Sequence, residues 1–191
     1  MSVIKAIRKA TSQFEERGWD SLYWAIDLHG TISSNQNYSS DDLSIHYYPF
    51  AKESLQLLST IPHVKLILYT CSHEQNIKYI LELMKKDGIN FHFFNENPEA
   101  KNTEYGDYSR KLYFNVLLDD KAGFDPEEDW EIIYENLLPY KYYRIYSPRI
   151  KADIGSCNIK TPQDKEYILE QDPGCELIEI TKEEFEEISN E

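Results

Sequence analysis

Three short apolar runs constrain the fold of this 191-residue chain more than any other feature. They predict strands at residues 23–28, 64–69 and 116–118, and an acidic or hydroxyl residue lies at the end of each run, as in YWAID, VKLILYT and VLLDD. Near-continuous apolar runs of this length are typical of strands covered on both faces, as in parallel sheets. We therefore expect three buried strands with a polar residue at the end of each.

Segments with helical spacing of apolar residues separate these runs. We expect helices at residues 2–17, 49–60, 73–86 and 127–138, and one more short strand at residues 91–94. Strands that alternate with helices indicate an α/β fold, in which right-handed crossovers connect the strands of a parallel sheet.

The pattern weakens after Pro139. We expect an edge strand at residues 142–146, another strand at residues 176–180, and a last acidic helix that begins with a capping box from Thr181 to Glu184.

The length favours one domain with a sizeable core. Its parts are an N-terminal helix at residues 1–20, a core at residues 21–139 and a C-terminal extension at residues 140–191. We expect the extension to pack on the core, or to face a partner.

Charge disfavours some classes of partner. The net charge is −14, and residues 164–191 alone hold eleven acidic residues against two lysines. A field of this sign repels polyphosphate backbones, so general nucleic-acid binding is disfavoured. No apolar segment reaches the length of about 18 residues that a membrane span needs, so we expect no membrane association through a span.

The cysteine pattern indicates the compartment. The chain has three cysteines, Cys71, Cys157 and Cys175, and no CxxC motif. We therefore expect reduced thiols in a cytoplasmic protein, and no zinc site.

The polar strand ends suggest a single site. Ligands of open parallel sheets bind beyond the carboxyl ends of the strands, where Asp27, Thr70 and the pair Asp119 and Asp120 would converge. Only one of the paired aspartates would face the site if the strand continued through both, and we favour Asp119. The plainer alternatives are that Asp27 belongs to an ordinary turn, and that Thr70 and Ser72 cap the helix that follows.

In these residues the chain resembles the haloacid dehalogenase-like (HAD) superfamily, most of whose members are Mg²⁺-dependent phosphohydrolases with an aspartate nucleophile. The stretch Asp27-Leu-His29-Gly-Thr31 matches the first motif, Asp-x-Asp-x-Thr, at two of its three positions. The other motifs are matched by Thr70, by Lys111 (with Arg110 and Lys121 as alternatives) and by Asp119 with Asp120. The resemblance covers residues 22–138 and implies a three-layer, Rossmann-like fold with a central, mainly parallel sheet.

The resemblance also implies a mechanism. Asp27 would attack phosphorus and form an aspartyl-phosphate. Mg²⁺ would be held by Asp27, by the backbone carbonyl of His29 and by Asp119 or Asp120. The residues expected to contact phosphate are Gly30, Thr31, Thr70, Cys71 and Lys111, although Cys71 also suits simple packing.

His29 is the departure from the family pattern, because it stands where the family has its acid–base aspartate. Imidazole can do this work in principle, since its ordinary pKa of about 6.5 suits neutral pH. The main alternative is a phosphate-binding, metal-binding or regulatory protein without turnover, and a further one is different chemistry on the same scaffold.

The motif spacing leaves no room for a cap domain, because the segments at residues 32–64 and 72–111 are too short to hold one. We therefore expect an open site, covered at most by a flap at residues 33–48, by the C-terminal extension or by a second subunit. An open site suits a large phosphorylated substrate.

Overall fold

The structure is a computed structural model that describes residues 3–34 and 44–189. The chain divides into two compact units, Met1–Tyr134 and Glu135–Glu191, and each is described by itself. The division lies five residues before the core boundary expected at residue 139. That the second unit packs on the first stays a prediction.

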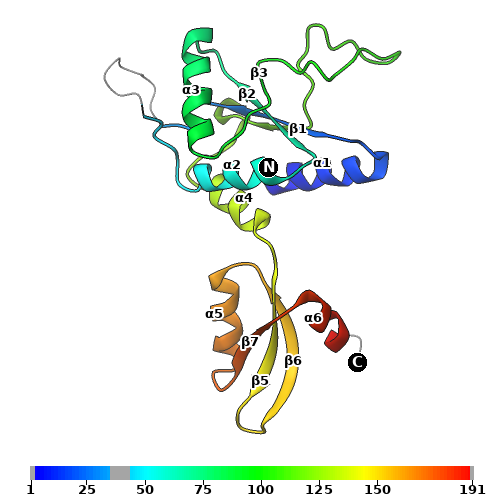
Figure 1. The fold of residues 1–191 in the computed structure, drawn as a ribbon, viewed down its shortest axis with the longest axis vertical. Coiled ribbons are helices and arrows are strands. Elements are labelled where there is room, and N and C mark those ends of the chain that lie inside the picture. Colours follow the sequence, from blue (N-terminus) through cyan, green and yellow to red (C-terminus); the bar gives the residue numbers. More distant parts are fainter. Residues whose placement is uncertain (1–2, 35–43, 190–191) are drawn as a thin grey trace. The chain divides into compact units, whose positions relative to one another are not determined.

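A four-stranded parallel sheet carries the apolar runs in neighbouring strands (Figure 1). Its strands are β1 (Leu22–Asp27), β2 (Val64–Tyr69), β3 (Phe93–Phe94) and β4 (Val116–Leu118), in the order β3-β2-β1-β4. Ile26 pairs with Leu68 on one side and with Leu118 on the other. This register brings the carboxyl ends of β1, β2 and β4 to the same edge of the sheet, as expected.

The expected helices begin in the first unit, with α4 crossing the division, and they differ from the predicted ranges by at most two residues. They are α1 (Val3–Arg17), α2 (Ala51–Thr60), α3 (Glu74–Lys86) and α4 (Asp129–Leu137). Fully buried aliphatic side chains from the strands and from α2 and α3 form the core, and burial of each contributes about 1.5–3 kcal/mol. They include Ile26, Leu55, Leu58, Leu66, Ile67, Leu68, Ile77 and Ile80.

Buried and half-buried polar contacts fix α2 against the neighbouring helices. At the end of α3, Asp87 accepts hydrogen bonds from Lys52, Tyr47 and Gln56, with distances of 2.6, 2.9 and 2.6 Å. On α4, the carbonyl of Trp130 accepts a hydrogen bond of 3.2 Å from Ser54 of α2. The last of these contacts holds α4 close to α2.

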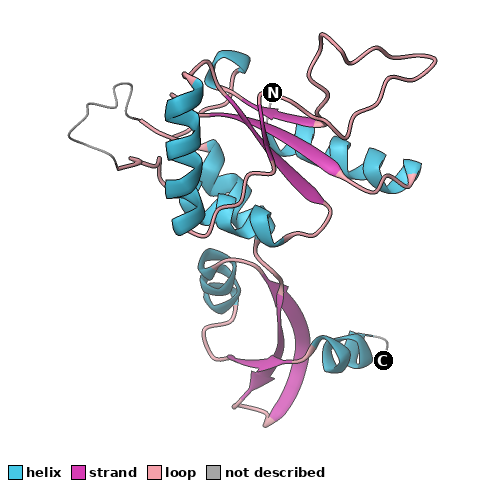
Figure 2. Cartoon of the chain, turned by 45° about the horizontal axis from the view of Figure 1, so that its top comes forward, coloured by secondary structure: helices cyan, strands magenta, loops and turns pink. Residues whose placement is uncertain are grey.

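The second unit is an antiparallel sheet of three strands with two helices (Figure 2). The strands are β5 (Lys141–Ser147), β6 (Ala152–Ile159) and β7 (Glu176–Ile180), in the order β6-β5-β7, and the helices are α5 (Pro162–Gln171) and α6 (Lys182–Ser189). The prediction of an edge strand at residues 142–146 is wrong, because β5 lies in the middle of this sheet. Strand β6 and helix α5 were not expected.

The predicted capping box of the last helix is confirmed. The Thr181 hydroxyl accepts from the Glu184 N–H at 3.2 Å, and the Glu184 carboxylate accepts from the Thr181 N–H at 2.8 Å. Across the described ranges, no helix combines the length and the apolar character needed to cross a bilayer.

Candidate metal and phosphate site

The loop after β1 is a tight turn that presents Asp27 at the edge of the sheet. Asp27 is the last residue of β1 and is half-buried. The Gly30 N–H donates to the Ser33 carbonyl at 2.9 Å, and the Ser33 N–H donates to the Leu28 carbonyl at 2.9 Å. Gly30 has a φ of +80°, in the left-handed region that suits glycine, which explains why the turn contains this residue.

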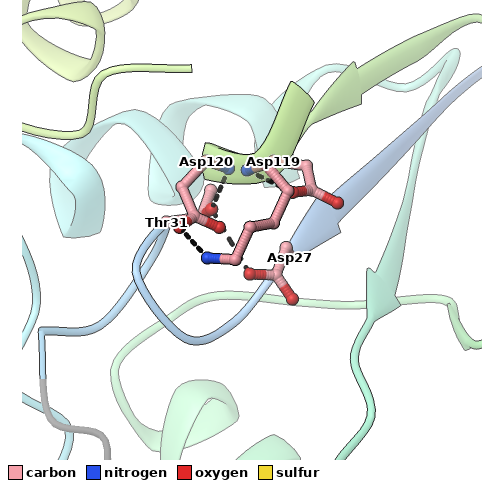
Figure 3. Close-up of polar contacts among 5 residues, drawn as sticks. Asp27, Thr31, Asp119 and Asp120 are labelled. Carbon is pink, nitrogen blue, oxygen red and sulfur yellow. Dashed lines mark hydrogen bonds and ion pairs between the residues drawn. The ribbon is translucent and has the colours of Figure 1, made fainter. Parts of the chain in front are cut away.

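Thr31 ties the β1 loop to the loop after β4. Its side chain is fully buried, and its hydroxyl donates to Asp27 Oδ2 at 3.4 Å while it accepts from the Asp120 N–H at 3.0 Å (Figure 3). Its carbonyl accepts a 2.7 Å hydrogen bond from Trp130 Nε1. The buried hydroxyl therefore positions Asp27 relative to Asp120, and a role of Thr31 in binding phosphate stays a prediction.

Asp119 and Asp120 both reach the site, because the strand does not continue through them. Strand β4 ends at Leu118, and a 3-10 helix (η1, Asp120–Ala122) begins two residues later. Asp119 caps this helix by accepting a 2.8 Å hydrogen bond from the Lys121 N–H. The condition under which only one of the two aspartates would face the site is therefore not met.

Three carboxylates thus meet at the edge of the sheet. Asp27, Asp119 and Asp120 each offer an oxygen, and these oxygens lie within 4.8 Å of one another. Burial raises the pKa of Asp27 above its ordinary value, and the charges of Asp119 and Asp120 raise it further, whereas the Leu28 N–H and His29 oppose the change. Clustered hard oxygen donors of this kind suit Mg²⁺, which is typically bound by one or two carboxylates and several waters.

Lys121 supplies positive charge to the cluster. Its ammonium pairs with Asp120, and this hydrogen bond, together with the charges of Asp120, Asp119 and Asp27, raises the pKa of the lysine. The Lys121 side chain is 83% exposed, so solvent screens the pair.

A second network of hydroxyl and imidazole groups adjoins the cluster. His29 Nε2 lies 2.9 Å from Ser72 Oγ, and the Thr70 hydroxyl donates to Ser72 Oγ at 3.2 Å. The N-cap residue of α3 is His73, and its side chain makes no capping hydrogen bond. Thr70 and Ser72 therefore do not cap this helix, and that alternative is wrong. His29 follows Asp27 by two residues in the same turn, and it opposes the rise in the pKa of Asp27.

Asn95 holds the end of β2 in place, and the sequence analysis did not identify it. Its side chain accepts from the Thr70 N–H at 2.8 Å and donates to the Thr70 carbonyl at 2.6 Å. Asn95 follows β3 directly and has a φ of +53°, a conformation that asparagine tolerates better than most residues. Its place at the end of β3, like the polar residues at the ends of the other three strands, was the signal that could have identified it.

Lys111 and Cys71 lie at the periphery. Lys111 is exposed and lines a cavity of about 270 Å³ together with Asn95, and it forms no ion pair with any residue that the structure describes. Cys71 is exposed and, like Cys157 and Cys175, is a free thiol. That Lys111 and Cys71 bind phosphate stays a prediction.

The expected flap is described only at its two ends, because residues 35–43 lie outside the described residues. At these ends the Ser34 N–H donates to the His46 carbonyl at 3.0 Å, and the Tyr48 N–H donates to the Ile32 carbonyl at 3.1 Å. The flap therefore starts and finishes beside the turn that contains Gly30 and Thr31.

Comparison with known proteins gives one similar structure. No family model and no curated protein matches the chain. A solved structure, described as that of the conserved protein coded by a locus from Bacteroides thetaiotaomicron, is 29% identical, with a TM-score of 0.46. The match covers 60% of this chain and 88% of that one.

Proposed function

We propose that this chain is a Mg²⁺-dependent phosphohydrolase of the HAD-like type, with Asp27 as its nucleophile. The observation that carries the proposal is the meeting of three carboxylates from two strand ends, within 4.8 Å of one another, beside a histidine. A site with these groups at the carboxyl edge of a parallel sheet has the place and the chemistry for phosphoryl transfer.

The donor set fits a divalent cation. Asp27, Asp119, Asp120 and the backbone carbonyl of His29 would hold Mg²⁺, because three clustered carboxylates repel one another unless a positive charge joins them. When bound, the ion would neutralise charge on the phosphoryl oxygens and on the nucleophile. In its absence, the Lys121 ammonium compensates part of this charge.

Asp27 has the position of a nucleophile. One of its oxygens is fixed by the Thr31 hydroxyl at 3.4 Å, and the half-buried carboxylate lies at the sheet edge. Its oxygen would attack phosphorus in line, and the bond from phosphorus to the leaving oxygen would break. The resulting aspartyl-phosphate divides one difficult displacement into two easier ones.

His29 would carry the protons. As imidazolium it would protonate the leaving oxygen, and as neutral imidazole it would then take a proton from the water that hydrolyses the aspartyl-phosphate. The 2.9 Å contact with Ser72, which itself contacts Thr70, fixes the orientation of the ring. Because His29 stands in place of the usual acid–base aspartate, we propose that turnover is slow.

Phosphate binding would use groups around this pair. Thr70 directly follows Tyr69, the residue of β2 that pairs with Asp27, and Lys111 would approach from the side of Asn95. We also propose that the fold is a three-layer arrangement without a cap domain, and that the protein is cytoplasmic. The substrate would be a large phosphorylated molecule, or a smaller one that a second subunit covers. The short segments between the motifs support the lack of a cap domain and an open site.

The proposal is tested with a generic aryl phosphate and Mg²⁺. Asp27→Asn should abolish hydrolysis, whereas Glu82→Gln, the same chemical change at an exposed position of α3, should leave it intact. His29→Asp should raise kcat by about tenfold or more, toward the contribution of about 10²–10⁴ that a matched acid–base group gives. Hydrolysis that survives in Asp27→Asn would contradict the proposal.

A binding protein without turnover is the second candidate. It is favoured by His29 at the acid–base position and by the Lys121 ammonium at the carboxylates. This alternative predicts saturable binding of Mg²⁺ and inorganic phosphate, with no hydrolysis in the wild type or in His29→Asp.

A further inference from the structure

A second cavity lies at the opposite edge of the parallel sheet. Its volume is about 640 Å³, and its wall includes Trp19, Tyr23, Tyr108 and Tyr113. Tyr23 is the second residue of β1, four residues before Asp27, a distance of about 13 Å along a strand. The cavity is therefore separate from the carboxylate cluster, and what it binds does not depend on the proposed function.

The aromatic rings of this cavity face in different directions. The Tyr113 ring stands at 73° to that of Tyr23 and at 69° to that of Tyr108, with centroid distances of 5.9 and 5.1 Å. A flat ligand such as a nucleobase stacks best between parallel rings. Ring faces at steep angles instead suit a compact, rounded group, and each face attracts positive charge through its quadrupole.

A carboxylate stands beside these rings. Glu99 Oε2 accepts a 2.8 Å hydrogen bond from the Tyr23 hydroxyl, which uses only part of the acceptor capacity of the carboxylate. Burial and the contact with Glu99 raise the pKa of Tyr23 to about 12, so the phenol keeps its proton at neutral pH. The Tyr23 hydroxyl therefore remains the donor in the contact with Glu99.

The wall already holds one cation against an aromatic face. The Arg17 guanidinium lies 5.2 Å from the centroid of the Trp19 ring. The other charged groups of the wall are Asp20 and Lys101. With Glu99 and Arg17, the wall therefore has two carboxylates and two basic groups. Charge alone does not select a ligand here, and the selection comes from the tyrosine faces and the adjacent Glu99.

We infer that this cavity binds a compact organic cation, a methylated ammonium group, in the space lined by the edge-to-face tyrosine rings and adjacent to Glu99. The rings would supply cation–π attraction, and the carboxylate would supply the counter-charge. The chemical class is a quaternary or trimethylated amine, as a free small molecule or at the end of a longer one.

Choline chloride tests this inference, with 3,3-dimethylbutan-1-ol as a neutral probe of the same shape and potassium chloride to match the ionic strength. In titrations followed by calorimetry and by NMR, choline should bind saturably, at least tenfold more tightly than the neutral alcohol. Tyr108→Leu and Glu99→Gln should each weaken choline binding by about tenfold, the equivalent of about 1.4 kcal/mol.

Tyr105→Leu is the matched control. Tyr105 belongs to the same loop but is 93% exposed and does not line the cavity, so its removal should leave choline affinity unchanged. Far-UV circular dichroism would verify that each variant is folded. Equal binding of choline and the alcohol, no saturable choline binding to the wild type, or equal effects of Tyr108→Leu and Tyr105→Leu would overturn the inference.

Discussion

At the scale of single residues, Asp27 is the position where folding and the proposed activity conflict. Its pKa is raised by burial and then by the neighbouring carboxylates, so the folded chain holds a proton there more tightly than the unfolded chain does. The stability of the folded state must then fall as the pH rises through the interval between the two pKa values. A charge that folding does not favour is typical of a functional site.

Asp27→Asn should therefore stabilise the metal-free protein at neutral pH. The amide carries no charge to repel Asp119 and Asp120, so we expect a gain of less than about 1 kcal/mol in the free energy of unfolding. In a chain of this length, such a gain raises Tm by about 2 °C. The gain should vanish near pH 3, where the wild-type carboxylate is protonated as well. Thermal unfolding in EDTA at several pH values measures this difference.

Asp87→Asn serves as the control of opposite sign. Burial would raise the pKa of Asp87, but the hydrogen bonds from Lys52 and Tyr47 outweigh it and lower the pKa, so the ionised form is stabilising. Asp87→Asn should lower Tm at neutral pH and lose this effect as the pH falls through the pKa. A destabilised Asp27→Asn variant at neutral pH would refute the electrostatic account of the cluster.

At the scale of secondary-structure elements, the turn between β1 and α2 positions the carboxylates. A Cβ atom at Gly30 would lie 3.0 Å from Asp120 Oδ2, and the φ of +80° would strain any other residue. A side chain at residue 30 would therefore press on the Asp120 carboxylate and displace it.

Gly30→Ala should lower both stability and Mg²⁺ affinity. Gly18→Ala is the matched control, because Gly18 also has a positive φ, of +59°, but no atom lies within 4 Å of an added Cβ. Both variants should lose about 1 kcal/mol of stability from backbone strain. Only Gly30→Ala should bind Mg²⁺ more weakly in calorimetric titration, and equal Mg²⁺ affinities would contradict the steric argument.

The sequence predicted the parallel sheet well because burial on both faces leaves a strong apolar signal. The strands at residues 64–69 and 116–118 have the predicted ends. Strand β6 gave no such signal, since its sequence ADIGSCNI contains residues of low strand propensity and half of it is exposed. Sequence also could not show that β5 and β7 pair in a separate sheet, because pairing partners depend on tertiary contacts.

The sequence predicted which residues form the site, but not how they are arranged. Asp27 and the two aspartates after β4 were identified from the strand ends, but their common orientation depends on the 3-10 turn at Asp120. Asn95 was missed because a single polar residue after a strand of two residues is an ordinary loop feature. The contact of Trp130 with the Thr31 carbonyl joins residues 99 positions apart, which periodicity cannot indicate.

At the scale of the whole molecule, the two units give separate readouts. All three tryptophans, Trp19, Trp24 and Trp130, belong to Met1–Tyr134, as do the three carboxylates. Tryptophan fluorescence therefore reports on the unit that contains the proposed site, whereas far-UV circular dichroism reports on both units.

Mg²⁺ should raise the unfolding temperature seen by tryptophan fluorescence. A ligand that binds only the folded state adds its binding free energy to stability, which is worth about 2–4 °C per kcal/mol for a chain of this length. Loss of the fluorescence shift in Asp119→Asn would tie it to the cluster, and an unaltered fluorescence transition in saturating Mg²⁺ would count against the metal site.

The most direct test is a crystal structure of the protein soaked with Mg²⁺ and beryllium fluoride, which mimics a phosphorylated aspartate. Our account predicts one Mg²⁺ ion shared by Asp27 and by Asp119 or Asp120, with the beryllium fluoride on the second oxygen of Asp27. Beryllium fluoride on another residue, or carboxylates that share no ion at saturating Mg²⁺, would contradict the assignment of Asp27 as the nucleophile.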